Sequence, residues 1–240
     1  MPRFYCPLPL ASGARLALPE ELAHHAVRVL RLRDGDTVTL FDGTGGEYPA
    51  VLQIQGKAAW ALLGAFDPRE AELPGRITLV QGLPGGDKMD WVVEKAVELG
   101  AARVVPITAQ RSVLQLSGER AQKRLAHWRR IAQAAAEQCG RNRLMEIDPP
   151  CALAEWLAGP ARGLTLLCHP DAQDLLADAL GAGTPGGIYL LVGPEGGWSE
   201  EELLAARHAG ARAVRFGLRV LRTETAGLAM IAAVSALLNW

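Results

Sequence analysis

Two stretches, Leu190–Leu203 (LLVGPEGGWSEEEL) and Gly217–Met230 (GLRVLRTETAGLAM), constrain the fold of this chain more than any other feature. In the first, an apolar run typical of a buried strand leads into a loop rich in glycine. Ser199 and Glu202 then have the spacing of a capping box, which predicts that a helix begins there. The second stretch repeats this order of strand, loop and helix.

The second stretch is expected to form a strand over Ala213–Phe216, a loop over Gly217–Arg222 and a helix over Thr223–Leu238. We expect its strand to neighbour the strand of the first stretch. Ligands of open α/β sheets bind beyond the carboxyl ends of the strands. The two loops together therefore predict a ligand site.

The charge of the first loop indicates which class of ligand it takes. Three glutamates over Glu200–Glu202 would already match the dipole of the helix and would repel a polyphosphate. The chain also has no G-x-x-x-x-G-K-[ST] motif and no helix-opening G-x-G-x-x-G motif. The loops favour a neutral or cationic small molecule with a flat ring. Taken alone, residues 193–197 are equally consistent with a plain strand-to-helix turn.

Upstream of these stretches, strands alternate with helices, which predicts a parallel sheet with helices on both faces. The expected strands are Arg76–Gln81, Arg103–Ile107, Leu144–Ile147 and Leu164–Cys168, and the expected helices are Asp87–Leu99, Glu119–Gln138 and Asp171–Leu180. Asp87 suits the N-cap position of the first of these helices, and Gly100 suits its C′ position.

The amino-terminal region instead shows short strands joined by turns. We expect strands over Thr37–Phe41, Tyr48–Gln55 and Trp60–Phe66, a turn over Asp42–Glu47 and a short helix over Pro19–Leu30. This pattern predicts a small β-barrel with one inserted helix. Asp67–Gly75 is a polar segment with prolines, typical of a linker, so the expected domains are residues 1–70 and 76–240.

Charge is unevenly distributed, although the whole chain carries a net charge of only −1. Residues 76–146 hold 12 Lys or Arg against 7 Asp or Glu, which leaves +5, whereas the flanking regions are acidic. A basic region in an acidic protein is typical of nucleic-acid contact. The arginines and lysines over Arg120–Arg130 are also consistent with a solvated helix face. Arg141 and Arg143 lie in an expected loop, from which we expect them to reach RNA.

Composition excludes several other classes of protein. The four cysteines are far apart and lack C-x-x-C spacing, which excludes a standard zinc cluster and argues against a disulfide framework. No apolar run reaches about 18 residues, and the first residues do not resemble a signal peptide. We therefore expect a cytoplasmic protein with no membrane association and no metal.

The blocks LVGPEGGWSEEEL and GLRVLRTETAG resemble the signature of the bacterial 16S rRNA (uracil-N3) methyltransferases, in the SPOUT superfamily of S-adenosylmethionine enzymes. The resemblance covers nearly the whole chain. It continues, in the order expected of the family, through HHAVRVLRLR with Phe41-Asp42-Gly43, KMDWVVEKAVELG, AEQCGRNR and LCHP. Met145 departs from the family pattern, because relatives often have proline there.

This resemblance implies an α/β fold in which a PUA-like β-barrel precedes a SPOUT-type parallel-sheet domain with a trefoil knot. Threaded knots are essentially absent from proteins, so the knot rests on the resemblance alone. The resemblance also implies a homodimer. Its implied activity is S-adenosylmethionine-dependent methylation of N3 of a specific uridine in 16S rRNA of the small ribosomal subunit.

The implied chemistry points to two catalytic candidates in the second loop. Uridine N3 carries a proton at neutral pH, so the enzyme must remove that proton or stabilise the resulting anion. Arg222 is the candidate for stabilising negative charge on the uracil, and Glu224 is the candidate base or a residue that orients Arg222. Glu224 is equally consistent with a carboxylate that only favours the helix start.

The remaining candidates fall into two groups. The expected cofactor-binding residues are Leu167, His169, Gly193, Pro194, Glu195, Gly196, Leu218, Leu221, Thr223 and Thr225. The expected RNA-binding residues are Arg28, Arg31, Arg33, Lys88, Arg141 and Arg143. His169 is also consistent with a histidine that only caps its loop.

Two other functions remain open from the sequence. One is a non-catalytic RNA-binding or ribosome-assembly protein that keeps the fold and the cofactor pocket. The other is a methyltransferase that acts on tRNA or on another base. The intact Arg222-Thr223-Glu224 loop favours an enzyme over the first alternative.

Overall fold

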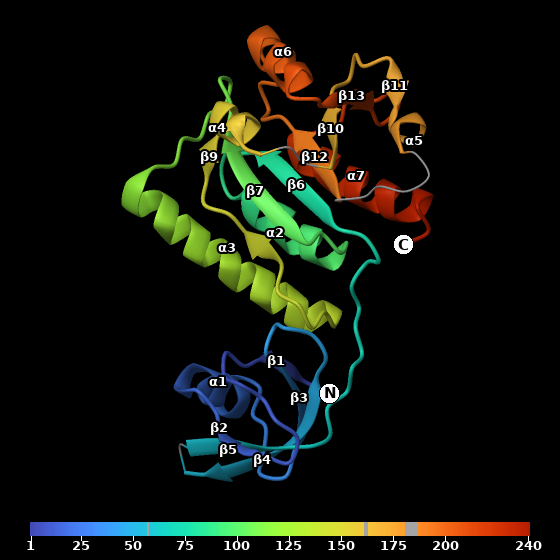
Figure 1. Cartoon of the computed structure of the whole chain (residues 1–240). Coiled ribbons are helices and arrows are strands. Elements are labelled where there is room, and N and C mark those ends of the chain that lie inside the picture. The colour runs from blue at the N-terminus through green and yellow to red at the C-terminus, as the bar shows by residue number, and fades with distance from the viewer. Residues whose placement is uncertain (57, 161–162, 181–186) are drawn as a thin grey trace. The chain divides into compact units, whose positions relative to one another are not determined.

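The computed structural model describes residues 1–240 with the exception of 57, 161–162 and 181–186 (Figure 1). Contacts within it define two units. The first unit consists of residues 1–72 and 136–144, and the second of residues 73–135 and 145–240. The segment 136–144 thus belongs to the first unit, although the sequence predicts one continuous second domain over 76–240.

The first unit contains a five-stranded sheet in the order β1-β3-β4-β5-β2. Its strands are β1 (Arg3–Tyr5), β2 (Arg15–Ala17), β3 (Thr37–Phe41), β4 (Tyr48–Gln55) and β5 (Ala58–Leu63). β1 is parallel to β3, and the other pairs are antiparallel. The predicted bounds of β3 and β4 are confirmed. β1 and β2 were not predicted because three-residue strands have too little periodicity to detect.

The predicted helix of this unit is present in two parts, α1 (Glu20–His24) and the π-helix η1 (His25–Val29). Ala23 and Ala26 face the core, which also contains Leu40 and Leu52. η1 ends at Val29 with Leu30 as its C-cap, and the next residue, Arg31, adopts a left-handed conformation with φ of 57°. A non-glycine residue pays about 1–2 kcal/mol for that conformation. The Leu32 amide, which donates to the Ala26 carbonyl at 3.0 Å, closes the turn.

The second unit is a parallel sheet in the order β11-β13-β10-β12-β6-β7-β8, with β9 paired to β7. Its strands are β6 (Ile77–Gly82), β7 (Arg103–Thr108), β8 (Glu146–Ile147), β9 (Cys151–Ala152), β10 (Leu164–Cys168), β11 (Asp174–Leu175), β12 (Ile188–Val192) and β13 (Arg212–Arg215). All of these pairs are parallel, as predicted.

Helices cover both faces of this sheet, as predicted (Figure 1). They are α2 (Lys88–Glu98), α3 (Gly118–Cys139), α4 (Leu153–Ala158), α5 (Leu176–Ala179), α6 (Glu200–His208) and α7 (Thr223–Leu237). On one face, Gly227 of α7 lies so close to β6 that an added Cβ would be 2.8 Å from a Leu79 methyl group. On the other face, Val80 packs in one cluster with Trp156 of α4 and Ala206 of α6.

The helix start at Ser199 is confirmed. The Glu202 amide donates to the Ser199 hydroxyl at 3.2 Å, and the Ser199 amide donates to the Glu202 carboxylate at 2.9 Å. Gly100, with φ of 87°, ends α2 in the left-handed conformation expected of a C′ residue. Asp87 does occupy the N-cap position, but its side chain makes no cap hydrogen bond and accepts from Arg124 at 2.9 Å.

Two predictions for this unit are wrong. The segment predicted as a helix over Asp171–Leu180 contains the short strand β11 and the four-residue helix α5. Pairing with β13 and an Arg212–Asp174 ion pair at 2.7 Å override its helical pattern. In addition, β12 and β13 are not neighbours, because β10 lies between them. The loops after three strands, rather than two, therefore meet at one edge of the sheet.

Candidate cofactor and RNA sites

A cavity of about 510 Å³ opens in the second unit beyond the carboxyl ends of β10, β12 and β13. Its size falls within the range of pockets that hold small organic ligands. Both predicted signature loops contribute, through Val192–Glu195 and through residues 216–217 and 219–224, and the end of β10 adds Cys168 and His169. The predicted site is therefore formed within one unit.

Hydrogen bonds tie the two signature loops to each other and to the sheet. The Thr223 hydroxyl donates to the Gly193 carbonyl and accepts from the Gln81 amide group at 2.9 Å. The Trp198 indole donates to the Cys168 carbonyl at 3.3 Å. An added Cβ on Gly193 would lie 3.1 Å from the Trp198 ring, so this position has no room for a larger side chain. These contacts hold the cavity wall together.

Lys88, the first residue of α2, is the centre of an ion-pair cluster at the cavity. Its Nζ lies 2.9 Å from Oε1 of Glu195 and 3.6 Å from Oε2 of Glu224. The hydrogen bond to Glu195 raises the pKa of Lys88 above its ordinary value. Desolvation acts to raise the pKa of Glu195, but hydrogen bonds from Lys88 and from main-chain amides outweigh it and lower that pKa. Both partners therefore remain charged at neutral pH.

Arg222 occupies the N-cap position of α7, next to Thr223 and Glu224. Its side chain is exposed at the cavity and has no ion pair within 4 Å among the described residues. Arg219 has the same exposed, unpaired character, whereas Arg111 donates to the Gly196 carbonyl at 3.2 Å. Three guanidinium groups thus face a cavity that also contains two carboxylates.

The structure brings most of the predicted cofactor residues to this cavity. Those that line it are His169, Gly193, Pro194, Glu195, Leu221 and Thr223. Nδ1 of His169 accepts the Asp171 amide at 3.2 Å, so this histidine also caps its own loop.

Four predicted cofactor residues lie outside the lining. Leu167 is buried in the apolar cluster beneath the sheet, because its side chain points to the other face of β10. Leu218 is 92% exposed. Gly196 packs against the main chain of Arg111, and Thr225 is exposed on the first turn of α7.

Several lining residues were not predicted as part of the cavity from the sequence. They are Arg111, Cys168, Trp198, Phe216 and Arg219, together with Lys88, which was predicted at the RNA. Cys168 and Phe216 directly precede predicted loops, and this place at a strand end is the signal that could have assigned them to the cavity. Burial raises the pKa of the Cys168 thiol to about 11, so it is neutral at physiological pH. Arg111 follows a strand of the same sheet, but nothing in its local pattern indicated that its loop reaches the cavity.

The first unit carries the predicted RNA-binding residues of the amino-terminal helix. Arg28, Arg31 and Arg33 are all exposed at or just beyond the end of η1. None of the three has an ion pair within 4 Å in the part of the chain that the structure describes. Val29 and Leu30 between them are 56% and 45% exposed. This end of the helix therefore combines free cations with exposed apolar side chains.

The expectation that Arg141 extends from its loop to reach RNA does not fit its buried side chain. Only 4% of its side chain is exposed, and its guanidinium makes hydrogen bonds of 2.9 and 2.6 Å to the Glu72 carboxylate. Arg143 is more open, with a side chain that is 54% exposed and an ion pair to Glu70 at 3.2 Å. Arg141 therefore holds its loop in place, and we remove it from the RNA-binding candidates.

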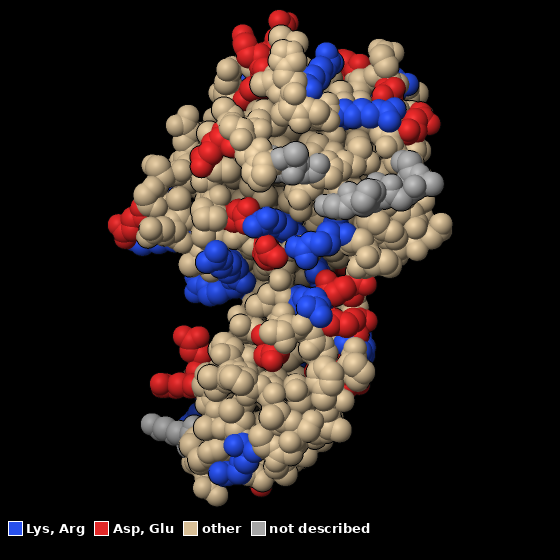
Figure 2. Space-filling view, viewed as in Figure 1, with Lys and Arg blue, Asp and Glu red and all other residues tan. Residues whose placement is uncertain are grey.

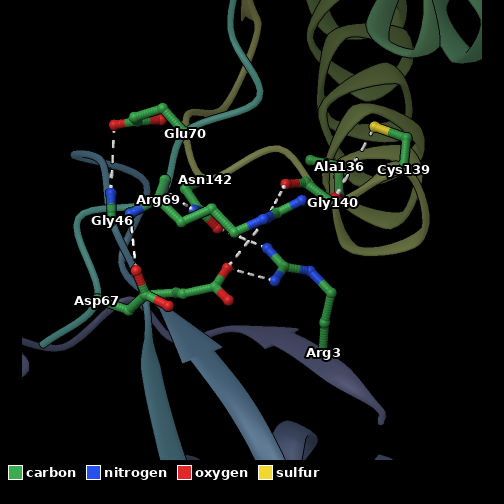
Figure 3. Close-up of polar contacts among 10 residues, drawn as sticks. Arg3, Gly46, Asp67, Arg69, Glu70, Ala136, Cys139, Gly140 and Asn142 are labelled. Atoms are coloured by element: carbon green, nitrogen blue, oxygen red, sulfur yellow. Dashed lines mark hydrogen bonds and ion pairs between the residues drawn. The ribbon is translucent and has the colours of Figure 1, made fainter. Parts of the chain in front are cut away.

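The rest of this loop is held in the same way (Figure 3). Arg3 points toward Asn142 and donates to its side-chain oxygen, and the Asn142 amide group donates to the Arg69 carbonyl at 2.7 Å. Arg69 in turn donates to the Gly140 carbonyl at 3.1 Å. These contacts explain why residues 136–144 belong to the first unit.

Basic side chains also gather along α3 in the second unit (Figure 2). Arg120, Lys123, Arg129 and Arg130 are exposed. Lys123 is paired with Glu119 at 2.7 Å, a spacing typical of a solvated helix face.

Among the described residues, no cluster of three or more His, Cys, Asp or Glu side chains could hold a metal ion, and no helix is long and apolar enough to cross a membrane.

Comparisons with known proteins agree with this architecture. Residues 71–235 match the model of the RNA methyltransferase domain, and residues 18–63 match that of the RNA methyltransferase PUA domain. Ribosomal RNA small subunit methyltransferase E of Bacillus subtilis is 33% identical over 223 residues, which are 90% of this chain and 87% of the relative. The same-named Mycobacterium tuberculosis protein is 34% identical over 94% of this chain and 88% of the relative.

A crystal structure of ribosomal RNA small subunit methyltransferase E from Neisseria gonorrhoeae, bound to S-adenosyl methionine, matches with a TM-score of 0.91. It is 40% identical and covers 99% of this chain and 98% of that chain. The chain therefore belongs to the RNA methyltransferase family defined by this domain and its PUA domain. The family resemblance seen in the sequence is confirmed.

Proposed function

We propose that this protein uses S-adenosylmethionine to methylate N3 of a uridine in 16S rRNA of the small ribosomal subunit. The observation that carries the proposal is the cavity itself, in which Arg222 and Glu224 face the space between two glycine-containing loops. The relatives' names support the small-subunit rRNA as the substrate. That substrate would place the protein in the cytoplasm.

The cavity fits an S-adenosylmethionine molecule in size, and its lining includes charges of both signs. Gly193, Pro194, Leu221 and Thr223 would hold the adenosine part through main-chain groups and apolar contacts. Glu195 and Glu224 supply negative charge that suits a sulfonium, and the absence of a phosphate-binding motif fits a ligand without phosphates. When bound, S-adenosylmethionine supplies the methyl group and its sulfur takes the electron pair of the broken C–S bond.

The residues of the second loop would prepare the uracil for this transfer. Loss of the N3 proton leaves a lone pair on N3 and negative charge that spreads to the carbonyl oxygens. Glu224 accepts that proton, and Arg222 donates hydrogen bonds to the charge that develops on the uracil. Because the Arg222 side chain has no ion pair among the described residues, it is available for this contact.

RNA would be bound by Arg28, Arg31 and Arg33 of the PUA-like domain and by the exposed Arg143. We assign residues 1–70 to that domain and residues 76–240 to a SPOUT methyltransferase domain with a trefoil knot, and we propose that the protein is a homodimer. Leu218 and Val220 support the dimer, because they expose 92% and 79% of their surface in the loop that borders the cavity. Apolar exposure of this kind is typical of an interface.

Mass mapping of 16S rRNA from a deletion strain tests the proposal. We expect one uridine to lose a methyl group, and purified protein with S-adenosylmethionine to restore it at N3. A methyl group lost from tRNA or from another base would support the alternative substrate. Unmodified rRNA in both strains, together with RNA binding by the protein, would support a non-catalytic assembly factor.

A further inference from the structure

Lys88 reaches into the cavity from the start of α2 and lies between the two signature loops. Its Nζ is 2.9 Å from Glu195 of the first loop and 3.6 Å from Glu224 at the start of α7. We propose that Lys88, anchored by Glu195, is a positioning residue that keeps Glu224 ionised before substrate binds. The inference rests on the proposed function, in which Glu224 accepts the N3 proton.

The anchor keeps the lysine charge in place. Oε1 of Glu195 accepts both the Lys88 ammonium at 2.9 Å and the Gly85 amide at 3.0 Å. The carboxylate is therefore attached to the main chain of the loop that precedes α2. Since the hydrogen bond with Glu195 raises the pKa of Lys88, the ammonium keeps its proton over the range in which a carboxylate titrates. Lys88 thus stays charged whatever the state of Glu224.

Glu224 is placed to exchange a proton. Its side chain is only 15% exposed, and its Oε2 is buried with no hydrogen-bond donor among the residues that the structure describes. At 3.6 Å the Lys88 ammonium attracts this oxygen electrostatically but is too distant to form a hydrogen bond. None of the described residues therefore donates a hydrogen bond to this oxygen. When a proton arrives, Lys88 keeps its partner Glu195, so protonation of Glu224 leaves no buried charge unpaired.

Glu195 is the negative neighbour that opposes ionisation of Glu224. The remaining charged or titratable side chains that line the cavity favour the ionised form or carry no charge. They are Arg111, Cys168, His169, Arg219 and Arg222. The arginines favour the ionised form of Glu224, and the thiol stays neutral because its pKa is raised to about 11. Lys88, in contrast to these groups, forms the ion pair with Glu224 found among the described residues. Removal of the Lys88 charge should therefore shift the titration midpoint of Glu224.

Carbon-13 NMR of the glutamate carboxylates in the free protein measures this effect directly, with Glu224→Gln used to assign the signal. We expect Lys88→Met to raise the titration midpoint of Glu224 by about one pH unit, because it removes a positive neighbour. Lys88→Gln repeats the test with a polar side chain should Lys88→Met fail to fold. Lys88→Arg should stay near the wild-type midpoint.

Glu195→Gln should shift the titration midpoint of Glu224 in the opposite direction. It removes a negative neighbour and frees Lys88 to pair fully with Glu224, so the midpoint should fall below the wild-type value. Lys95→Met is the matched control, because Lys95 bridges Glu94 and Glu98 at 2.7 Å on the same helix but does not line the cavity. It should leave the midpoint unchanged. An unchanged midpoint in Lys88→Met would overturn the inference.

The rate of RNA methylation provides the second measurement. In Lys88→Met the acidic limb of the pH–rate profile should move to higher pH, because Glu224 must be ionised to accept a proton. Reduced salt dependence of RNA binding with an unmoved carboxylate titration would instead make Lys88 an RNA contact and overturn the inference. A shifted titration in a protein that methylates no RNA would refute only the proposed function, since the titration needs no substrate.

Discussion

Two charged clusters in this protein differ in how completely their groups are paired. Around Arg141 and Asn142, nearly every buried polar side-chain atom has a partner, and Arg3 Nε is the exception among the described residues. Around Lys88, by contrast, Oε2 of Glu224 is buried with no hydrogen-bond donor among the described residues, and Glu224 lines a cavity. Hydrogen-bonded charges hold a loop in place, whereas Glu224, whose ion pair with Lys88 at 3.6 Å is too long for a hydrogen bond, lines a cavity that is open to a ligand. Burial and pairing, rather than residue type, separate the two roles.

The largest expected effect tests the cavity side of this contrast. Arg222→Ala should lower the rate of methyl transfer by roughly 10²–10³, the usual loss for one preorganised donor to a developing charge. Its affinity for cofactor and RNA should change little, because the charge it stabilises appears only during the reaction. Single-turnover methylation with saturating rRNA measures the rate. A near-normal rate would mean that this loop only holds the cofactor and that the charge is stabilised elsewhere.

The second expected effect tests the paired cluster. Arg141→Ala should destabilise the protein by about 3 kcal/mol, because it leaves the Glu72 carboxylate without its partner in a mostly buried pair. Denaturant unfolding measures this loss. Arg143→Ala is the matched control, and it should cost less than about 1 kcal/mol because its ion pair is largely exposed. Equal stability of the two variants would show that the buried pair of Arg141 and Glu72 stabilises the protein no more than an exposed one.

The third expected effect concerns ligand binding at the cavity. S-adenosylmethionine or S-adenosylhomocysteine at a hundredfold excess over Kd should stabilise the folded protein by about 2.7 kcal/mol. The reason is that the cavity wall exists only in the folded state, where the Thr223 hydroxyl joins the two loops. Calorimetry should detect this gain for both ligands. Binding of ATP or NAD, with no binding of either sulfur ligand, would contradict the assignment of the cavity.

The smallest expected effect concerns the first unit. Arg28→Ala and Arg31→Ala should each weaken RNA binding and lower the slope of log affinity against log salt by about 0.7 per lost phosphate contact. Their affinity for the cofactor should not change. Arg15→Ala is the control, because Arg15 already donates to Gln53 at 2.7 Å and lies over the Trp60 ring. Filter binding at several salt concentrations measures the slopes, and equal slopes in all variants would return these arginines to a solvated surface.

Elements with strong local signals were predicted well from the sequence. The capping box at Ser199 and the glycine at position 100 determine a helix start and a helix end through their own main chain, so neither depends on distant residues. The predicted helix over Asp171–Leu180 failed for the opposite reason. Its pattern was weak, and pairing of β11 with β13 decided its structure.

The candidate site was predicted in part. The sequence indicated both loops because each carries its own strand, loop and helix signals in one continuous stretch. It missed Arg111 and Trp198 as lining residues, and it assigned Lys88 to the RNA. The local pattern of a lysine at a helix start does not show that Glu195, over 100 positions later, accepts a hydrogen bond from its ammonium group at 2.9 Å.

By itself the sequence determined the class of fold, the position of the two signature loops and the family. These follow from local periodicity, turn chemistry and contiguous motifs, which act over fewer than about 20 residues. Only the tertiary structure decided that β10 lies between β12 and β13, that Arg141 is buried against Glu72 and that Lys88 joins two glutamates at the cavity. Each of these depends on which distant groups meet, and a charged residue exposed to water has the same sequence letter as one held in an ion pair.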